Sequence, residues 1–448
     1  MMLPLVLLLA CREAPPSRPN FLVVDLDTLR ADRIGRERNG ASITPHIDAL
    51  AARGVRFDQM IAQSGWTLPS LAALLTGRLP LGVLQRVPAP QVEWIAADAR
   101  TLPEILGLYG YQTAVFYGAT LPATFPAMSR GFAEHGEPPA AKPDGDAARE
   151  VVQWLDRSPK EPWLAVVHTA DLHLMGDVPH DDVDLYAPDH PPPCVEQGSL
   201  AYPLLVDTWA TTLGRPAAEE LLRAHYDAVV HHYDADVGEM VKALERDGVR
   251  SHTVVVVLSD HGQELLEHGN ADHGPPYEFN LRVPLVIDDP THPRGVRVPT
   301  MVQTIDVAPT ILDIAGVPVD AAMDGRSLVP LMNGGEGYVE RPAVSITDPH
   351  RMAVRTPEWL LLRCQAAGCP RPRPQDASAV LELYDLAQDP TQLTNLAGTG
   401  LAVERELTPI LDALPIAGRR KAVDDGMSAE QEKLLRERGY WDAGDASH

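Results

Sequence analysis

The sequence predicts an α/β protein with a mostly parallel central sheet flanked by helices and a small antiparallel sheet near the C-terminus. Short apolar runs alternate with helical patterns along most of the chain, which is typical of parallel sheets. Three of the runs end in Asp or His, residue types that bind metal ions. After about residue 338 the pattern changes to short strands, as in MAVRTPEWLLLRC and VLELYDL, which indicates the smaller sheet.

Four apolar runs are the expected strands of the central sheet, and they lie at residues 21–26, 111–116, 163–167 and 253–258. Expected helices, from apolar spacing, lie at 45–53, 102–109, 145–155, 217–245 and 428–438, the last beginning with a capping-box spacing of Ser428 and Gln431.

A further short helix is predicted within SGWTLPSLAALLTGR. Leu68, Leu71, Ala72 and Leu75 follow the i, i+3, i+4, i+7 spacing of one buried helix face. Thr67 stands directly before this helix, and Gly77 stands just past its end. Two readings of Thr67 stay open: an ordinary N-cap, or a nucleophile at the positive end of the helix dipole.

The chain divides into segments by composition. We expect a signal peptide (1–10), a lipid-anchored spacer (11–18), a catalytic domain (19–334), a small C-terminal subdomain (335–414) and a tail (415–448). Within the catalytic domain, residues 177–216 form an insertion rich in Asp, Pro and His. Its His180 and His190 allow a metal site, but the prolines favour an irregular polar loop over the site.

The N-terminus resembles an export signal. The apolar run of MMLPLVLLLAC is too short to span a bilayer and stops at Cys11. Leu-Leu-Ala-Cys resembles a bacterial lipobox, so Cys11 is expected to carry lipid and to hold the exported protein at a membrane, facing the periplasm or cell exterior. No Lys or Arg precedes the run, and a buried N-terminal strand is the alternative.

Charge and cysteine content narrow the class of protein. The 448 residues carry 62 acidic and 38 basic side chains, a net charge of −24, which makes a nucleic-acid partner unsuitable. Cys364 and Cys369 are close enough in sequence for a small disulfide, which is plausible outside the cytoplasm. Cys194 has no assignable role, and the chain has no Cys-x-x-Cys metal motif.

The polar residues that follow the strands predict a metal site. Ligands of open α/β sheets bind at the carboxyl ends of the strands, so Asp27, His173, Asp260 and His261 are expected to meet there. Each residue alone could be structural, as a helix cap or a surface histidine. Together with the Thr67 hydroxyl they suit one divalent ion, with Zn or Mn favoured by His261 and Ca or Mg possible. Gly262 is expected to let the backbone turn sharply there.

Seven stretches in order resemble the sulfatase family of the alkaline phosphatase superfamily, over nearly the whole of residues 19–440. They are DTLRAD (27–32), TPHIDALAARGVRF (44–57), WTLPSLAALLTG (66–77), SDHGQELLEHG (259–269), YEFNLRVPLVI (277–287), TIDVAPTILDIAGVP (304–318) and ELYDLAQDPTQLTNLA (382–397). The resemblance implies an alkaline-phosphatase-like sandwich fold and hydrolysis of sulfate or phosphate esters.

Residue by residue, the resemblance implies that Asp27, Asp260, His261 and Thr67 bind the metal. Thr67 takes the nucleophile position, while His173 and His273 take the positions of contacts to the substrate oxyanion or leaving group. His261 stands where sulfate-ester enzymes often carry Asn and phosphoryl-transfer members carry His.

The chain departs from the family pattern at three positions. Thr67 replaces the Cys or Ser from which formylglycine is made, so it is not expected to be converted. Leu71 replaces the signature Arg, and Thr28 replaces a second metal-binding Asp. Asp25 could substitute for that Asp only if its strand ended early.

Three functions are compatible with these residues. The first is an exported metal-dependent hydrolase of phosphate or sulfate esters that uses Thr67 and prefers phosphate. The second is a sulfatase-like binding protein whose catalysis has decayed, and the third is an envelope phosphoryl or headgroup transferase. The substrate would be a small molecule or a glycan or lipid ester.

Overall fold

We describe the protein from a computed structural model of the 448-residue chain. The structure describes residues 18–83, 95–96, 98–118, 126–136, 146–169, 180–186, 202–269, 271, 273–292, 295–335, 337–348, 351–364 and 380–414. Several predicted features lie outside these residues: the leader with Cys11, His173, His190, Cys194, Cys369 and the helix at 428–438.

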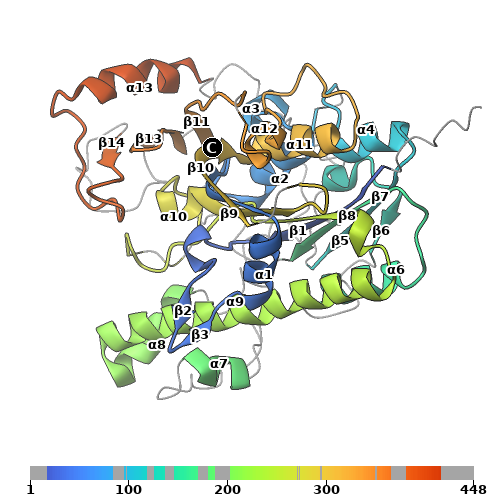
Figure 1. Ribbon diagram of the computed structural model, residues 1–448. Coiled ribbons are helices and arrows are strands. Elements are labelled where there is room, and N and C mark those ends of the chain that lie inside the picture. Colours follow the sequence, from blue (N-terminus) through green and yellow to red (C-terminus); the bar gives the residue numbers. More distant parts are fainter. Residues whose placement is uncertain are drawn as a thin grey trace, which may run out of the picture.

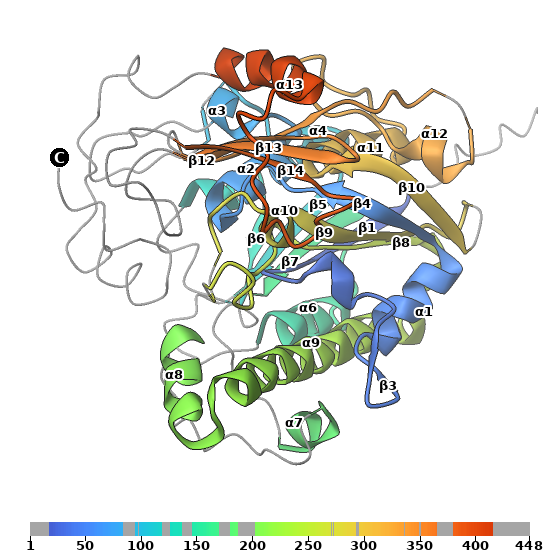
Figure 2. The ribbon, with the colours of Figure 1, turned by 90° about the vertical axis from the view of Figure 1, so that its left-hand side faces the viewer.

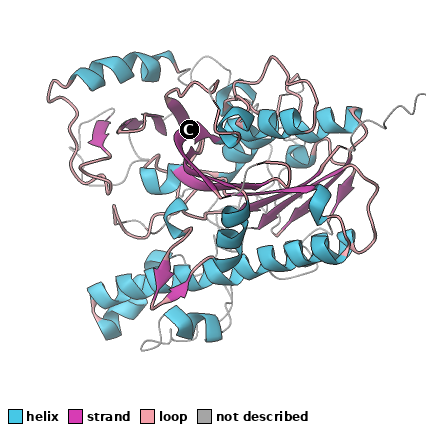
Figure 3. Ribbon diagram, viewed as in Figure 1, coloured by secondary structure: helices cyan, strands magenta, loops and turns pink. Residues whose placement is uncertain are grey.

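The described residues form the following elements (Figures 1 and 3). The strands are β1 Asn20–Leu26, β2 Glu37–Arg38, β3 Ala41–Ser42, β4 Val55–Ile61, β5 Gln112–Tyr117, β6 Glu134–His135, β7 Trp163–Thr169, β8 Thr253–Leu258, β9 Arg282–Asp288, β10 Val296–Gln303, β11 Ala343–Asp348, β12 Arg351–Arg355, β13 Trp359–Cys364 and β14 Val380–Asp385. The helices are α1 Pro45–Arg53, α2 Thr67–Thr76, α3 Pro80–Val83, α4 Leu102–Leu108, α6 Asp146–Leu155, α7 His180–Tyr186, α8 Tyr202–Leu213, α9 Arg215–Arg246, α10 Glu278–Leu281, α11 Val307–Ile314, α12 Val329–Met332 and α13 Ala402–Ala413.

The predicted central sheet is confirmed. Its eight strands run in the order β10-β4-β9-β8-β1-β7-β5-β6. Every pairing is parallel except those of β9, which runs antiparallel to both β4 and β8. Because β1 lies between β7 and β8, the carboxyl ends of these three strands meet at one edge, as the sequence predicted.

Helices cover both faces of this sheet (Figures 1 and 2). Phe21 and Val23 of β1 pack in one core with residues of α2, α4 and α11. The alternate residues Leu22 and Val24 pack in a second core with residues of α1, α6 and α9. Because strand side chains alternate between faces, both faces of β1 are buried, and its residues are apolar except for Asn20 and Asp25.

The small antiparallel sheet near the C-terminus is also confirmed. It has the strand order β11-β12-β13-β14. One face packs on Leu407 and Leu411 of α13, and the other packs on residues of the main sheet such as Ile61 and Met301. Cys364, at the end of β13, is disulfide-bonded, whereas Cys369 lies outside the described residues, so the pairing of these two cysteines stays a prediction.

The insertion at 177–216 differs from the prediction of an irregular loop. It contains α7 and α8, and α9 follows directly. Val206 and Trp209 of α8 are buried in the same core as α9. Tertiary packing of these apolar residues thus stabilises helix in a segment whose prolines indicated none. Among the described residues, no helix is both long enough and apolar enough to cross a membrane.

Candidate active site

Thr67 is the first residue of α2, and its hydroxyl faces the edge of the sheet rather than its own helix. Trp66 is the N-cap, and no side chain caps the helix. Thr67 Oγ1 lies 3.1 Å from His261 Nε2, and both residues are fully buried. The N-cap interpretation of Thr67 is therefore wrong, whereas Gly77 does end the helix in the left-handed conformation, with φ 63°.

Helix α2 is buried on every side, although the sequence predicted a single buried face. All ten of its residues are buried, including the polar Ser70 and Thr76. Both polar side chains reach a backbone carbonyl: Ser70 donates to Ser64 O at 3.0 Å, and Thr76 donates to Ala72 O at 2.6 Å. The packing around α2 therefore fixes the position of Thr67 at the sheet edge.

The strand register brings the predicted carboxylates together. Asn20 of β1 pairs with Thr253 of β8, and the pairing continues in step to Asp25 and Leu258. Asp27 and Asp260 each follow two residues after that last pair, so they leave the sheet side by side. Their side chains lie on the face that packs against α2, because alternate residues of β1 and β8 pack there.

Asp27, Asp260 and His261 form a fully buried cluster whose ligand atoms all lie within 4.8 Å of one another. His261 Nε2 is 3.4 Å from Asp27 Oδ1 and 3.5 Å from Asp260 Oδ2. Asp260 Oδ1 accepts the backbone N–H of His261 at 2.8 Å, whereas its Oδ2 has no hydrogen-bond partner. The structure thus brings the four predicted metal-binding residues together, Thr67 included.

The His261 ring is oriented for metal binding by its backbone neighbour. Its Nδ1 lies 3.0 Å from the carbonyl oxygen of Gly262, which assigns the proton to Nδ1 and the lone pair to Nε2. Gly262 is required for a reason other than the predicted sharp turn. Its φ is not positive, but a Cβ there would overlap the carbonyl oxygen of Phe279.

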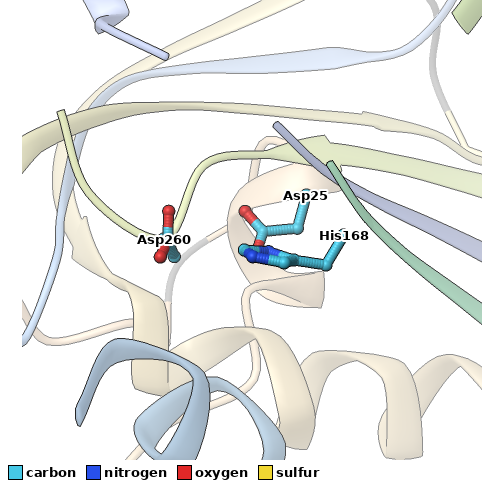
Figure 4. Close-up of side chains that lie close together, drawn as sticks. All are labelled: Asp25, His168 and Asp260. Carbon is cyan, nitrogen blue, oxygen red and sulfur yellow. The ribbon is translucent and has the colours of Figure 1, made fainter. Parts of the chain in front are cut away.

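Asp25 and His168 form a second group at the same edge, together with Asp260 (Figure 4). Asp25 and His168 are paired residues of β1 and β7, and His168 Nδ1 lies 2.9 Å from Asp25 Oδ2. Strand β1 continues through Asp25 to Leu26, so the strand does not end early. No role was predicted for His168, which directly follows the strand expected at 163–167, although a His at the end of an apolar strand was the available signal.

Burial determines the protonation of this region. Burial, and then the charge of Asp260, raises the pKa of Asp25 well above its usual range. Burial also raises the pKa of Asp260. Burial lowers the pKa of His168, and burial followed by the neighbouring His273 lowers the pKa of His261 well below its usual value. The imidazoles are therefore neutral and able to act as ligands.

Two of the residues that depart from the family pattern, Thr28 and Leu71, supply no metal ligand. Thr28, at the position of a second Asp, donates its hydroxyl to the Asp27 carbonyl at 2.6 Å and adopts φ 62°, which is rare for a β-branched residue. Leu71 is buried in the apolar core around α2 and brings no charge. The site therefore lacks both groups that the family pattern would provide.

His273 lies at the site, as the sequence predicted. Its ring stacks on that of His261, with centroids 4.4 Å apart, and its Nδ1 lies 3.0 Å from Gly65 O. An isolated bridge between Gly65 and Gly274 fixes this segment two residues before Thr67. The other predicted histidine, His173, lies outside the described residues.

The residues present fit a divalent ion. Two carboxylates, a neutral imidazole and a hydroxyl are ligands that Zn and Mn accept. Asp260 Oδ2 is buried without a hydrogen-bond partner, which is costly unless a cation binds there. In the described part of the chain, no Lys or Arg forms an ion pair with Asp25 or Asp260. The cluster is consistent with a metal site of the kind typical of sulfatases.

The fold is alkaline-phosphatase-like, and its buried Asp/His cluster is of a kind that can hold a metal ion. The chain belongs to the sulfatase family: residues 19–317 match the family described as Sulfatase. Residues 266–412 also match the C-terminal region of N-sulphoglucosamine sulphohydrolase.

Similar proteins include sulfatases and a phosphonate monoester hydrolase. The chain is 27% identical to the Delta 4,5-hexuronate-2-O-sulfatase of Bacteroides thetaiotaomicron, over 85% of each protein. It is 26% identical to human arylsulfatase A, over 92% of this chain and 90% of that protein. The structure of the phosphonate monoester hydrolase of Agrobacterium radiobacter has a TM-score of 0.66 and 21% identity, covering 94% of this chain and 95% of that one.

Proposed function

We propose that this protein hydrolyses phosphate esters in preference to sulfate esters, with Thr67 as the nucleophile. The observation that carries the proposal is the position of the Thr67 hydroxyl, at the N-terminus of α2 and 3.1 Å from His261 in a buried Asp/His cluster. A helix N-terminus favours a bound anion through its free N–H groups and its dipole. Asp27, Asp260, His261 and Thr67 would hold the divalent ion, which, when bound, lowers the pKa of the hydroxyl and neutralises charge on the substrate.

With Thr67 as the nucleophile, the reaction has two steps. Thr67 Oγ attacks phosphorus and loses its proton, the ester oxygen leaves as the alcohol, and a phosphothreonine forms. Water then attacks phosphorus, which releases inorganic phosphate and restores the hydroxyl. A sulfated formylglycine hydrate can expel sulfate through its second hydroxyl, but a sulfated threonine has no second hydroxyl. This difference supports phosphate as the preferred group.

His273 is suited to contact the leaving group or the anion, since it lies against His261 and is held by the Gly65 carbonyl. We propose the same role for His173 from its place in the sequence. The substrate remains a small-molecule, glycan or lipid ester. The two curated relatives are named as sulfatases, so sulfate esters form the reference class in the assay.

The test compares purified wild type with Thr67→Ala, using an aryl phosphate monoester, a phosphodiester and an aryl sulfate, each with added Mn or Zn. We expect phosphate ester turnover in the wild type and a loss of at least about 100-fold in Thr67→Ala. Thr76→Ala is the matched control, since Thr76 is a buried threonine at the other end of α2 whose hydroxyl donates to Ala72 O and accepts from the backbone N–H of Arg78. It should destabilise without lowering turnover.

Three results would contradict the proposal. Near-normal turnover of a phosphate ester by folded Thr67→Ala would exclude Thr67 as the nucleophile. A clear preference of the wild type for sulfate esters would overturn the assignment of the substrate. Absence of any turnover in a metal-loaded wild type would favour a binding protein instead.

We also propose that the protein is exported and tethered through lipid on Cys11, because the apolar run stops at Leu-Leu-Ala-Cys. Expression of the full gene and of Cys11→Ala in a Gram-negative host tests this. Membrane association should depend on Cys11, and equal solubility of the two proteins would exclude the lipid anchor.

A further inference from the structure

The pair Asp25–His168 lies beside the proposed metal ligands but is not among them. The two side chains come from paired positions of β1 and β7 and face Asp260 (Figure 4). Both are fully buried, at 0% exposure. Burying charged or polar groups at the ends of two apolar strands costs free energy, so some interaction must compensate for the burial of this pair.

The hydrogen bond within the pair sets the state of the imidazole. His168 Nδ1 lies 2.9 Å from Asp25 Oδ2, and the ionised form of Asp25 can only accept, so in that form Nδ1 carries the proton. Nε2 then holds a lone pair directed away from Asp25. Although fully buried, Nε2 has no hydrogen-bond partner. A carboxylate on one ring nitrogen and an open lone pair on the other is the arrangement that metal-binding histidines adopt.

The second ring nitrogen of His168 lies close to Asp27. His168 Nε2 lies 3.9 Å from Asp27 Oδ2, while His261 Nε2 lies 3.4 Å from Asp27 Oδ1. Two ligands that each lie about 2.1 Å from one ion can be no more than about 4.2 Å apart. Both spacings satisfy this limit, so each imidazole is near enough to Asp27 to share an ion with it.

We propose that His168 is a further ligand of the same metal ion through Nε2, and that Asp25 is the positioning residue that fixes its tautomer and orientation. The ion would then be held by β1, β7 and β8, and not by β1 and β8 alone. His168 supplies the ligand that the family pattern places at Thr28, whose hydroxyl is bonded to a carbonyl. The inference concerns metal binding and does not depend on which ester is hydrolysed.

The experiment measures metal binding to the metal-free full-length protein. Affinity for Zn²⁺ is obtained by competition with a chromogenic chelator, stoichiometry by elemental analysis, and coordination from the absorption spectrum of the Co²⁺ form. We expect one ion per chain and a ten- to hundredfold loss of Zn²⁺ affinity in His168→Ala, with a changed Co²⁺ spectrum. Asp25→Asn should lose less, because the amide oxygen can still accept from Nδ1.

The matched control is His292→Ala. His292 Nδ1 also bonds a buried carboxylate, Asp289, at 2.7 Å, but this pair follows β9 and lies at the opposite edge of the sheet. Its removal should leave Zn²⁺ affinity unchanged. Circular dichroism of each metal-free variant checks folding, and Asp25→Asn provides the test on its own if His168→Ala does not fold.

Two results would overturn the proposal. One is wild-type Zn²⁺ affinity with an unchanged Co²⁺ spectrum in folded His168→Ala and Asp25→Asn. The other is two ions per wild-type chain with one lost in His168→Ala, which would make Asp25, His168 and Asp260 a separate metal site. Neither result depends on turnover. A failure of the metal-ligand proposal can therefore be distinguished from a failure of the proposed phosphate ester activity.

Discussion

Replacing Gly262 by Ala tests whether close backbone packing holds the metal-binding loop in place. Gly262 follows His261, donates its N–H to Asn280 O at 2.8 Å and has no space for a side chain. An added Cβ would lie well inside 3.0 Å of the Phe279 carbonyl oxygen, a separation that real Cβ atoms essentially never show. Since the obstacle is backbone, the two segments must separate by about 1 Å.

The expected loss of stability in Gly262→Ala follows from these two contacts. Overpacking of this kind costs about 1–3 kcal/mol, and weakening the bond to Asn280 adds about 1 kcal/mol. We therefore expect Gly262→Ala to lower the free energy of unfolding by about 2–4 kcal/mol. Because His261 moves with its neighbour, affinity for Zn²⁺ should fall at least about tenfold.

Denaturant unfolding of the metal-free protein and chelator competition measure the two effects separately. Gly107→Ala is the control, because Gly107 lies in α4 with nothing within 4 Å of its would-be Cβ. That change should stabilise by about 0.5–1 kcal/mol. Wild-type stability and Zn²⁺ affinity in Gly262→Ala would refute the reasoning, because they would show that the loop accommodates the methyl group without moving His261.

Three further predictions concern stability. Thr28→Gly should raise the free energy of unfolding by about 1 kcal/mol, because Gly adopts φ 62° without strain; a clear loss in denaturant unfolding would contradict this. Burial lowers the pKa of His225 to about 4, so the unfolded chain binds the extra proton first, and about 3 kcal/mol of stability should be lost as pH falls from 6.5 to 4. His225→Phe should flatten that part of the pH profile, and an unchanged slope would exclude His225 as its cause. Finally, removing metal with a chelator should lower the apparent Tm and Zn or Mn should restore it, since free metal at 100 times Kd adds about 2.7 kcal/mol; an unchanged Tm would argue against a resident ion.

Local hydrophobic patterns were sufficient to predict most of the helices and strands. The predicted helix at 45–53 and the predicted strand at 253–258 match α1 and β8 to the residue. Each has clear boundary residues and an uninterrupted hydrophobic pattern. The insertion at 177–216 shows where such patterns fail. Its prolines indicated a loop, yet Tyr202–Leu213 is a helix because Val206 and Trp209 are buried against α9. A contact with another helix cannot be read from a local window.

For the site, the sequence by itself determined which strands end in ligands and that their carboxyl ends share one edge. Asp27, Asp260 and His261 follow from that rule, since the direction of parallel strands is set by their connections. It also placed the Thr67 hydroxyl directly before a short helix with one buried face, while leaving the N-cap alternative open.

Only the tertiary structure decided what these residues touch. The register between β1 and β7 sets Asp25 beside His168, and a register is a relation between two segments that neither segment specifies alone. The approach of Phe279 explains Gly262, where the sequence suggested a turn. The hydroxyl of Thr67 faces His261 and not its own backbone because packing around α2 fixes the helix against the ends of β1 and β8.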